Sequence, residues 1–337
     1  MNIKKAKIIC YGVRENEREY FNKLNKPYGY ELVFVDSFKI DENNLKLAKG
    51  CDAIMVRENV FLKEEHLKVL KEMGVKYLLT RTAGFDHINI KAAQELGFYS
   101  LQRVPVYSPN AIAELSVALG MTLLRKVQYT ADRAKDGDYT ITDIMLSKEV
   151  RKSVVGILGT GKIGYVTAEL YKGLGAKIIG YDPYPNENYK NLIEYVSLDK
   201  LLKESDIISV HCPLMDSTKH IISKANLDKV KDDVVIINAG RGALTDTKDM
   251  ITFLKANPKA TYGTDVIEGE EELFFKKYDK NNIPSILKEV GNLYPRFLVT
   301  PHVGAVTFEA LKNTIEVSFE NLNNALSGKE LVNNLFK

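Results

Sequence analysis

Short apolar runs rich in β-branched residues alternate with longer stretches of helical periodicity along the first third of the chain. The runs predict strands, and the stretch at 64–74, where apolar residues recur at helical spacing, predicts a helix between two of them. Strands joined through helices are typical of βαβ units, which build a parallel sheet covered by helices on both faces. The predicted strands of this first series are 7–12, 30–37, 52–59 and 75–84.

A second series of the same kind begins with a strand, a turn and a helix start at 153–164. The other strands that it predicts are 176–182, 206–213, 233–240, 260–266 and 296–303. The fold class predicted for the chain is therefore α/β, with two Rossmann-like, doubly wound parallel-sheet domains.

Two helical stretches lie outside these series. One spans 104–127, where Ser108 followed by Pro109 is a favourable helix start, and its apolar residues surround most of the helix, which predicts burial. A polar, irregular stretch at 132–150 follows it. The other helix, 307–328, ends at Gly328 with no strand after it, so we expect it to pack against a sheet that has already formed.

Composition narrows the class of protein. A length of 337 residues suggests two domains, and 45% hydrophobic with 27% charged residues is ordinary for a globular protein. A formal net charge of +3 without a basic block argues against a nucleic acid or membrane-surface partner. The apolar run near the N-terminus is too short for a signal peptide, and no stretch approaches the roughly 20 apolar residues of a membrane span. Three sparse cysteines indicate reduced thiols in the cytoplasm, and five histidines without a cysteine–histidine cluster predict no metal site.

A dinucleotide site is predicted where the second series begins. Gly159, Gly161 and Gly164 form the pattern G-x-G-x-x-G directly after a strand and at the start of a helix, where backbone N–H groups and the helix dipole favour a pyrophosphate. Asp182 ends the next strand, 18 residues beyond Gly164. A carboxylate there accepts hydrogen bonds from a ribose diol and repels a 2′-phosphate, which predicts NAD(H) over NADP(H).

Three ionisable residues follow the ends of later strands in this series: Arg241, Glu270 and His302. The carboxyl ends of parallel strands share one edge of a sheet, so we expect these side chains at one site. A histidine can exchange a proton near neutral pH, a glutamate can orient it, and an arginine can bind a carboxylate. Each alone has an ordinary explanation, as a solvated arginine, an acidic loop or a strand-end histidine; beside a dinucleotide motif, the three together favour catalysis. Gly240 and Gly242 are interpreted as clearing space for Arg241.

With these motifs in place, the chain resembles the NAD-dependent D-2-hydroxyacid dehydrogenase family over nearly its whole length. The motifs that carry the resemblance are "RTAGFDHI" (81–88), "VPVYSPNAIAELS" (104–116), "VGILGTGKIG" (155–164), "YDPYP" (181–185), "HCPL" (211–214), "NAGRGAL" (238–244), "GTDVIEGE" (263–270) and "TPHVG" (300–304). The branch that it resembles contains D-lactate, (R)-2-hydroxyglutarate and (R)-2-hydroxyisocaproate dehydrogenases.

The resemblance implies roles for individual residues. Arg241, Glu270 and His302 are the catalytic groups that it implies, and the backbone of Ala83 and Gly84 with the Tyr107 hydroxyl holds the substrate carboxylate. It places Asp265 near the nicotinamide and His211, Cys212 and Pro213 beside the adenosine half. The cofactor-binding set expected is Gly159, Thr160, Gly161, Lys162, Ile163, Gly164, Tyr181, Asp182, Pro183, His211, Cys212, Pro213, Asn238, Ala239, Gly240 and Asp265.

The resemblance also implies a discontinuous organisation. A flavodoxin-like, substrate-binding (catalytic) domain would comprise 1–103 with 303–337, and an NAD-binding Rossmann domain would comprise 104–302, so that the chain crosses the cleft twice at a hinge. Members of the family are commonly homodimers through the coenzyme domain, where the stretch 128–150 would contribute.

The activity implied is the reversible reduction of a 2-keto acid by NADH to the (R)-2-hydroxy acid. The substrate stays open among 2-oxoglutarate, pyruvate and a branched 2-keto acid. Arg57 follows a strand of the first series and either pairs with a distal substrate carboxylate or is a surface arginine. Ala305 stands near a position where lactate-specific relatives carry an aromatic residue, which favours a roomier pocket. The alternative of another class is an NADH-sensing, corepressor-like binding protein of the same fold.

Overall fold

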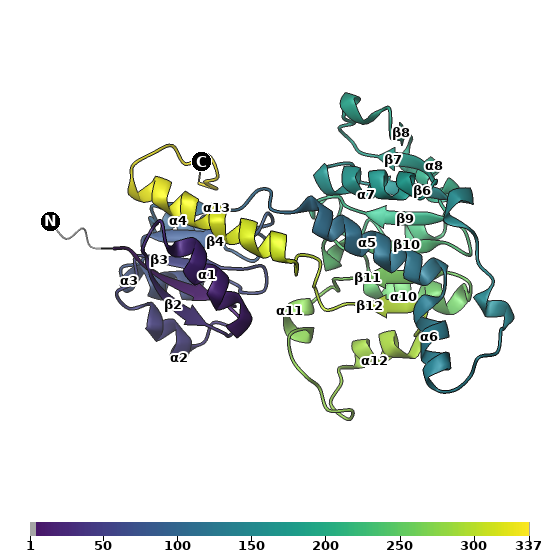
Figure 1. Cartoon of the computed structure of the whole chain (residues 1–337), viewed down its shortest axis with the longest axis horizontal. Coiled ribbons are helices and arrows are strands. Elements are labelled where there is room, and N and C mark those ends of the chain that lie inside the picture. The colour runs from purple at the N-terminus through teal and green to yellow at the C-terminus, as the bar shows by residue number, and fades with distance from the viewer. Residues whose placement is uncertain (1–4, 337) are drawn as a thin grey trace. The chain divides into compact units, whose positions relative to one another are not determined.

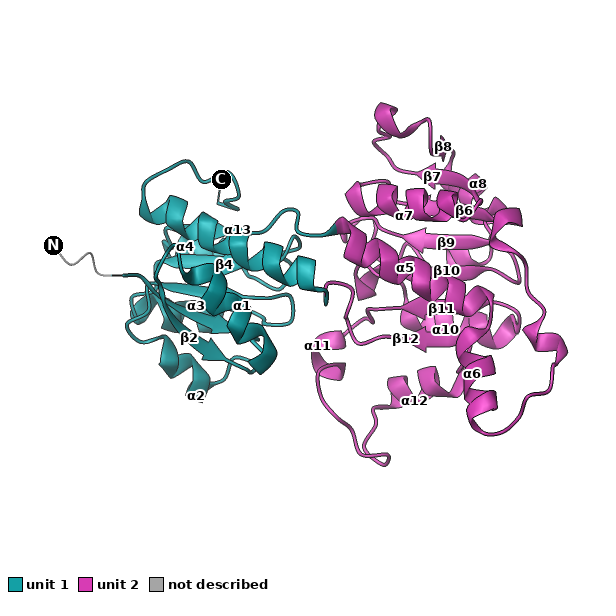
Figure 2. Cartoon of the chain, viewed as in Figure 1, with its two compact units in different colours: residues 1–108, 306–337 teal, residues 109–305 magenta. Residues whose placement is uncertain are grey.

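The chain divides into two compact units in the computed structural model, which describes residues 5–336 (Figures 1 and 2). Unit 1 comprises residues 1–108 and 306–337, of which 1–4 and 337 lie outside the described residues, and unit 2 comprises residues 109–305. The chain thus passes from one unit to the other twice. The predicted domain ends, 103 and 303, lie five and three residues from these changeovers, and the substrate and coenzyme roles of the two units stay predictions.

Unit 1 is built on a sheet of five parallel strands in the order β2-β1-β3-β4-β5, the strand order of flavodoxin-like folds. Its last strand, β5, was not predicted, because it has only three residues. The strands are β1 (Lys7–Tyr11), β2 (Glu31–Val35), β3 (Ala53–Val56), β4 (Tyr77–Thr80) and β5 (Ser100–Gln102), and the helices are α1 (Arg18–Asn25), α2 (Glu42–Leu45), α3 (Glu64–Glu72), α4 (Ile90–Glu95) and α13 (Phe308–Leu326).

Alternate residues of these strands enter two different cores, as the two-residue period of a strand requires. Ile9 and Ile54 pack in the core that contains Leu67 of α3, on one face of the sheet. Ile8 and Met55 pack on the other face in a core with Phe21 of α1 and with Ile315, Phe319 and Leu322 of α13. The C-terminal helix therefore completes a sheet made by the N-terminal part of the chain, as expected for a helix with no strand after it.

Unit 2 is built on a sheet of seven parallel strands in the order β12-β11-β10-β9-β6-β7-β8. Its strands are β6 (Val154–Leu158), β7 (Lys177–Tyr181), β8 (Glu194–Tyr195), β9 (Ile207–Val210), β10 (Val235–Asn238), β11 (Thr261–Thr264) and β12 (Phe297–Val299). The sheet grows in opposite directions from β6, so the switch point of the topology lies between β6 and β9. The two-residue strand β8 was not predicted.

The helices of unit 2 correct one prediction. The predicted helix start at Pro109 is confirmed: α5 (Pro109–Leu124) begins there and ends before Lys126, whose φ of 55° is left-handed. A second helix that was not predicted, α6 (Val127–Lys135), follows it. The start of the supposedly irregular stretch 132–150 is therefore helical. Further along are α7 (Lys162–Gly173), α8 (Leu198–Glu204), α9 (Lys224–Leu227), α10 (Thr247–Ala256), α11 (Glu270–Leu273) and α12 (Ser285–Asn292).

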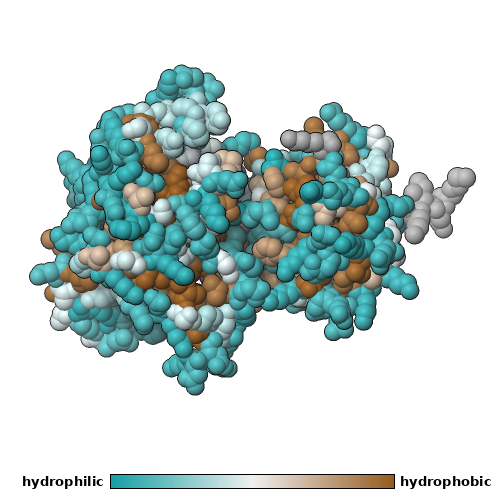
Figure 3. Space-filling view, turned by 180° about the vertical axis from the view of Figure 1, so that it is seen from behind, coloured by the Kyte–Doolittle hydropathy of each residue, from teal (hydrophilic) through white to brown (hydrophobic). Residues whose placement is uncertain are grey.

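Apolar side chains reach the surface of each unit as separate patches among hydrophilic ones (Figure 3). Several of the most exposed belong to one segment of unit 2, residues 127–146: Val127, Tyr139, Ile141, Ile144 and Leu146. Among residues 5–336, none of the helices combines the length and the apolar character that crossing a membrane requires.

Candidate active site

The predicted glycine-rich turn lies directly after β6, in the geometry that a dinucleotide site requires. Gly159 has a φ of +91°, and a Cβ atom there would lie 2.4 Å from the backbone nitrogen of Cys212. A Cβ at Gly164 would lie 2.1 Å from the carbonyl oxygen of Gly159. Gly161, by contrast, faces open space and is the N-cap of α7. Two glycines thus close the turn, and the third leaves the N-terminus of α7 accessible to a phosphate.

Asp182 follows β7 and is linked to this turn. One of its carboxylate oxygens accepts a hydrogen bond from the backbone N–H of Thr160 at 2.8 Å, and the other accepts from the N–H of Tyr184 at 2.9 Å. The Thr160 hydroxyl also lies 3.0 Å from the Tyr195 hydroxyl. The carboxylate is therefore held beside the turn, at the place where a ribose diol is expected from the motif.

Residues 211–213 follow β9, across the switch point from the glycine turn. The close approach of Gly159 to Cys212 joins the two segments. His211 Nε2 lies 2.8 Å from the Ser209 hydroxyl, and burial lowers the pKa of His211 to about 4, so the ring is neutral near pH 7. Burial raises the pKa of Cys212 to about 11, so its thiol is an uncharged apolar contact. Ligands of open α/β sheets bind at such a switch point, so the residues present fit a dinucleotide there.

Arg241 follows β10, on a loop that Asn238 holds. The buried Asn238 amide donates to the Arg241 carbonyl at 2.9 Å and accepts from the Gly240 N–H at 3.0 Å. Arg241 itself donates from Nη1 to the Gly240 carbonyl at 3.1 Å. The described contacts of Asn238 lie within its own loop and at neighbouring strand ends. They hold the backbone that carries Arg241.

The structure gives a reason for glycine at 242 that was not predicted. A Cβ at Gly242 would lie 2.3 Å from both the carbonyl carbon and the oxygen of Ile267, and 2.6 Å from the nitrogen of Glu268. Gly242 is therefore needed because the Arg241 loop and the turn before Glu270 touch through their backbones. At Gly240 the nearest atom is a methyl of Leu244 at 3.3 Å, a tight contact with the end of a flexible side chain. That Gly240 and Gly242 clear space for Arg241 stays a prediction.

His302 and Glu270 come together at the ends of β12 and β11. His302 Nδ1 lies 2.6 Å from Glu270 Oε1, and their side chains are 15% and 19% exposed. Because a carboxylate only accepts, Nδ1 carries the proton of this contact. The other Glu270 oxygen accepts from the Ile267 N–H at 3.2 Å. This arrangement fixes the tautomer of the imidazole and stabilises its protonated form.

Asp265 organises the segment that carries His302. Its carboxylate accepts hydrogen bonds from the Thr300 hydroxyl at 2.6 Å and from the N–H groups of Val303 at 2.9 Å and Gly304 at 2.7 Å. The backbone N–H of His302 donates to the Asp265 carbonyl at 2.8 Å, and His302 has a left-handed φ of 53°. Burial raises the pKa of Asp265. Strained non-glycine residues cluster at functional sites, and here one carboxylate holds the strain.

In unit 1, the segment after β4 carries Ala83 and Gly84. The Ala83 carbonyl accepts from Arg103 Nη1 at 3.0 Å, and the Gly84 carbonyl accepts from the Thr82 hydroxyl at 2.5 Å. Tyr107, at the end of the first part of unit 1, is tied through its carbonyl to Asn313 of α13 at 2.5 Å. These contacts fix the backbone of both segments, and the substrate contacts predicted for them stay predictions.

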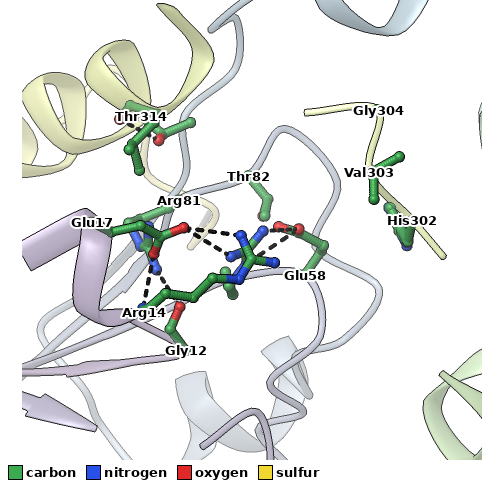
Figure 4. Close-up of polar contacts among 12 residues, drawn as sticks. Gly12, Arg14, Glu17, Glu58, Arg81, Thr82, His302, Val303, Gly304 and Thr314 are labelled. Carbon is green, nitrogen blue, oxygen red and sulfur yellow. Dashed lines mark hydrogen bonds and ion pairs between the residues drawn. The ribbon is translucent and has the colours of Figure 1, made fainter. Parts of the chain in front are cut away.

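Arg57 lies after β3 in unit 1 and is only 7% exposed, so the interpretation as a surface arginine is wrong. Its guanidinium lies above the ring of Phe38 at 5.4 Å, and it is 2.9 Å from Glu58 and 3.5 Å from Glu17, the two glutamates labelled in Figure 4. Burial alone would lower the pKa of Arg57, but the two glutamates outweigh it and raise that pKa. Arg81 lies in the same cluster, and burial lowers its pKa to about 10. A substrate carboxylate at Arg57 would therefore compete with Glu58.

Across residues 5–336, histidine, cysteine, aspartate and glutamate side chains do not gather in groups of three or more that could hold a metal ion. Arg241, Glu270 and His302 follow three adjacent strands, since Asn238 pairs with Thr264 and Thr264 with Val299 in the sheet.

Known proteins are similar to this chain in sequence and in fold. The family model described as D-isomer specific 2-hydroxyacid dehydrogenase, NAD binding domain, matches residues 117–304. An aromatic 2-oxoacid reductase of Clostridium sporogenes is 38% identical over 322 residues, 94% of this chain and 95% of the relative. A D-lactate dehydrogenase of Escherichia coli is 34% identical over 330 residues, 98% of this chain and 99% of the relative. The NAD-complexed D-isomer specific 2-hydroxyacid dehydrogenase of Lactobacillus delbrueckii ssp. bulgaricus superposes with a TM-score of 0.82 at 30% identity, covering 98% of this chain and 100% of that one.

The chain belongs to the NAD-dependent D-2-hydroxyacid dehydrogenase family, as predicted. It is an oxidoreductase with NAD(H) as its cofactor, and its two parallel-sheet α/β domains are the fold expected from the sequence. Sequence analysis did not single out His220 and Glu268, whose side chains lie 2.8 Å apart. Glu268 stands within the motif at 263–270, but in an acidic run that is typical of a solvated loop.

Proposed function

We propose that this protein reduces a small 2-keto acid to the (R)-2-hydroxy acid, with NADH as the hydride donor, and catalyses the reverse reaction. The observation that carries the proposal is the 2.6 Å contact between His302 and Glu270 at the edge of the sheet that also carries the glycine turn. A carboxylate-oriented imidazole there is a proton donor for an alkoxide, and Arg241 at the neighbouring strand end is a ligand for a carboxylate.

Each residue has a distinct part in the reaction. Gly159, Gly161 and the N-terminus of α7 would hold the pyrophosphate of NADH, Asp182 would accept hydrogen bonds from a ribose, and the bound cofactor supplies the hydride for C2 of the keto acid. Arg241 binds the substrate carboxylate and polarises the C2 carbonyl. His302 donates its proton to the C2 oxygen as the hydroxyl forms, and Glu270 stabilises the imidazolium before that transfer.

The substrate side chain is the finer part of the proposal. Relatives are named for lactate and for aromatic 2-oxo acids, and we keep 2-oxoglutarate and a branched 2-keto acid among the candidates. Arg57 supports a distal carboxylate only where Glu58 yields its place on the guanidinium, since the two are 2.9 Å apart. We therefore expect monocarboxylic keto acids to be reduced better than 2-oxoglutarate. The (R) configuration follows from family membership.

We also propose that the protein is a homodimer through unit 2. The segment 127–146 exposes Tyr139, Ile141 and Leu146 at 81%, 90% and 89%. It borders a cavity of about 320 Å³ that Ile144 and Leu146 help to line. Exposed apolar groups beside a cavity fit a self-complementary interface. Light scattering should show a dimer, and Ile141→Asp with Leu146→Asp should give monomers; monomeric wild-type protein would contradict this.

The direct test is NADH consumption with pyruvate, phenylpyruvate, a branched 2-keto acid and 2-oxoglutarate, with NADPH as the control for cofactor choice. The proposal predicts turnover with at least one keto acid, little with NADPH, and an (R) product by chiral chromatography. Binding of NADH without consumption in every mixture would favour the NADH-sensing alternative.

A further inference from the structure

His220 makes a set of contacts in unit 2 that the proposed reaction does not use. It lies in the loop between β9 and α9, and it has a left-handed φ of 54° although it carries a side chain. Its Nε2 lies 2.8 Å from Glu268 Oε1, and its Nδ1 lies 3.7 Å from Asp246 Oδ2. Non-glycine residues rarely adopt this backbone conformation, so the fold holds His220 there against a strain of about 1 kcal/mol or more.

The backbone beside His220 follows the segment that carries Arg241. His220 N–H donates to the Ala243 carbonyl at 2.8 Å, and Ile222 N–H donates to the Leu244 carbonyl at 3.0 Å. The next contact in the same row is from Asp246 N–H to the Ile222 carbonyl at 2.9 Å. Asp246 in turn caps α10, accepting from the N–H groups of Lys248 and Asp249. The segment 220–222 is therefore fixed to the Arg241 loop by its backbone.

The side chain of His220 connects that assembly to the turn that carries Glu270. Glu268 is separated from Glu270 by Gly269 alone, whose φ is +76° and which has open space around its Cβ position. The turn is closed by the hydrogen bond from the Glu270 N–H to the Ile267 carbonyl at 3.1 Å. Glu268 is held by His220, and Glu270 is held by His302 at 2.6 Å. The backbone contact at Gly242 brings the same two segments together from the other side.

We infer that His220 is a positioning residue for the reaction: through Glu268, it holds the turn 267–270 against the Arg241 loop, so that Glu270 and Arg241 keep a fixed geometry. The catalytic part of this inference rests on the proposed function. The backbone contact at Gly242 is one attachment of this turn to the Arg241 loop, and the His220–Glu268 contact is a second one. Misplacement of catalytic groups by about 1 Å can cost a factor of about 100 in rate.

The contact is a weak contributor to global stability, which makes the inference testable. The side chains of His220 and Glu268 are 32% and 38% exposed, and such pairs contribute less than about 1 kcal/mol to unfolding. His220→Ala should therefore unfold at nearly the same temperature as the wild type, with an unchanged Kd for NADH, while kcat for the keto acid falls about tenfold. His220→Gln, whose amide can still donate to Glu268, should recover most of that loss.

A double-mutant cycle with Glu268→Gln identifies the path. If His220 acts through Glu268, the double variant His220→Ala/Glu268→Gln should be no slower than the worse single variant. Lys229→Ala is the matched control, because it removes the Lys229–Asp199 ion pair of 2.8 Å in the same unit, and Lys229 precedes β10 whereas Arg241 follows it. Its kcat should equal that of the wild type. An unchanged kcat for His220→Ala, or losses that multiply in the double variant, would overturn the inference.

Hydrogen exchange separates this inference from the proposed function. The N–H groups of Glu270, Glu272 and Phe274 donate within the turn and α11, at 3.1, 3.1 and 2.8 Å. Their exchange should accelerate in His220→Ala and stay unchanged in Lys229→Ala, whatever substrate the protein uses. A wild-type protein without any turnover would remove the proposed function, and the positioning role would still stand on faster exchange; unchanged exchange in His220→Ala would end it.

Discussion

Gly242→Ala tests whether backbone contact between two loops sets the geometry of the site. The added Cβ would lie 2.3 Å from the Ile267 carbonyl, and ordinary contact begins near 3.4 Å, so the two segments must separate by about 1 Å. One of them carries Arg241 and the other leads to Glu270. Since a 1 Å displacement of catalytic groups costs up to about a hundredfold in rate, kcat/KM for the keto acid should fall by about 10- to 100-fold.

The assay is steady-state NADH oxidation with the best keto acid, together with NADH titration by fluorescence and thermal unfolding. The Kd for NADH should change little, because the glycine turn lies at a different strand end. Gly173→Ala is the matched control: it lies in α7 with open space at its Cβ position, and alanine favours a helix over glycine by about 1 kcal/mol. It should keep full activity. Wild-type kinetics in Gly242→Ala would refute the reasoning.

Three further predictions concern Glu270 and His211 in unit 2 and Glu58 in unit 1. Glu270→Gln removes a carboxylate 2.6 Å from His302, and since hydrogen bonds to charged groups contribute about 1.5–3 kcal/mol, kcat should fall roughly 10- to 100-fold with little change in NADH binding; equal kcat would contradict the role of Glu270. His211 has a folded pKa of about 4 against 6.5 for the unfolded chain, so the unfolded state binds the extra proton first as pH falls. The free energy of unfolding should therefore drop by up to roughly 3 kcal/mol between pH 6.5 and pH 4, and urea melts of His211→Gln should lack that drop. The same pH dependence in the wild type and in His211→Gln would contradict the prediction. Glu58→Gln removes the charge that Arg57 now pairs with, so KM for 2-oxoglutarate should fall severalfold while KM for pyruvate stays constant. Arg57→Ala is a poorer probe, because it leaves two buried carboxylates unbalanced. An unchanged KM for 2-oxoglutarate in Glu58→Gln would exclude a distal carboxylate at Arg57.

Much of the fold is predictable because periodicity reports burial. Most of the predicted strands have four or five residues, and several of them, such as β9 and β10, are buried along their whole length. The missed strands, β5 and β8, have three and two residues, too few to show a period of two. The break after α5 was missed because a lysine in left-handed conformation at 126 has no sequence signal.

The candidate site also has a part that the sequence predicts and a part that it does not. Gly159, Asp182 and His302 stand in motifs whose spacing encodes a local geometry, so the sequence predicts where they lie relative to their own strands. Contacts between loops have no such encoding. The need for glycine at 242 arises from Ile267, and the partner of Glu268 is His220, 48 residues away in the chain. Packing between strand ends decides both.

The central claim is that unit 2 would hold NADH as the hydride donor for C2 of a keto acid, while His302 supplies the proton to the C2 oxygen. Its most direct measurement is the reaction of keto acid with NADH that carries deuterium at the transferred position, with the product analysed by chiral chromatography and mass spectrometry. We predict one deuterium at C2 of the (R)-2-hydroxy acid, and a His302→Ala variant that binds NADH normally but forms product far more slowly. Product without deuterium, or an unimpaired His302→Ala variant, would contradict the account.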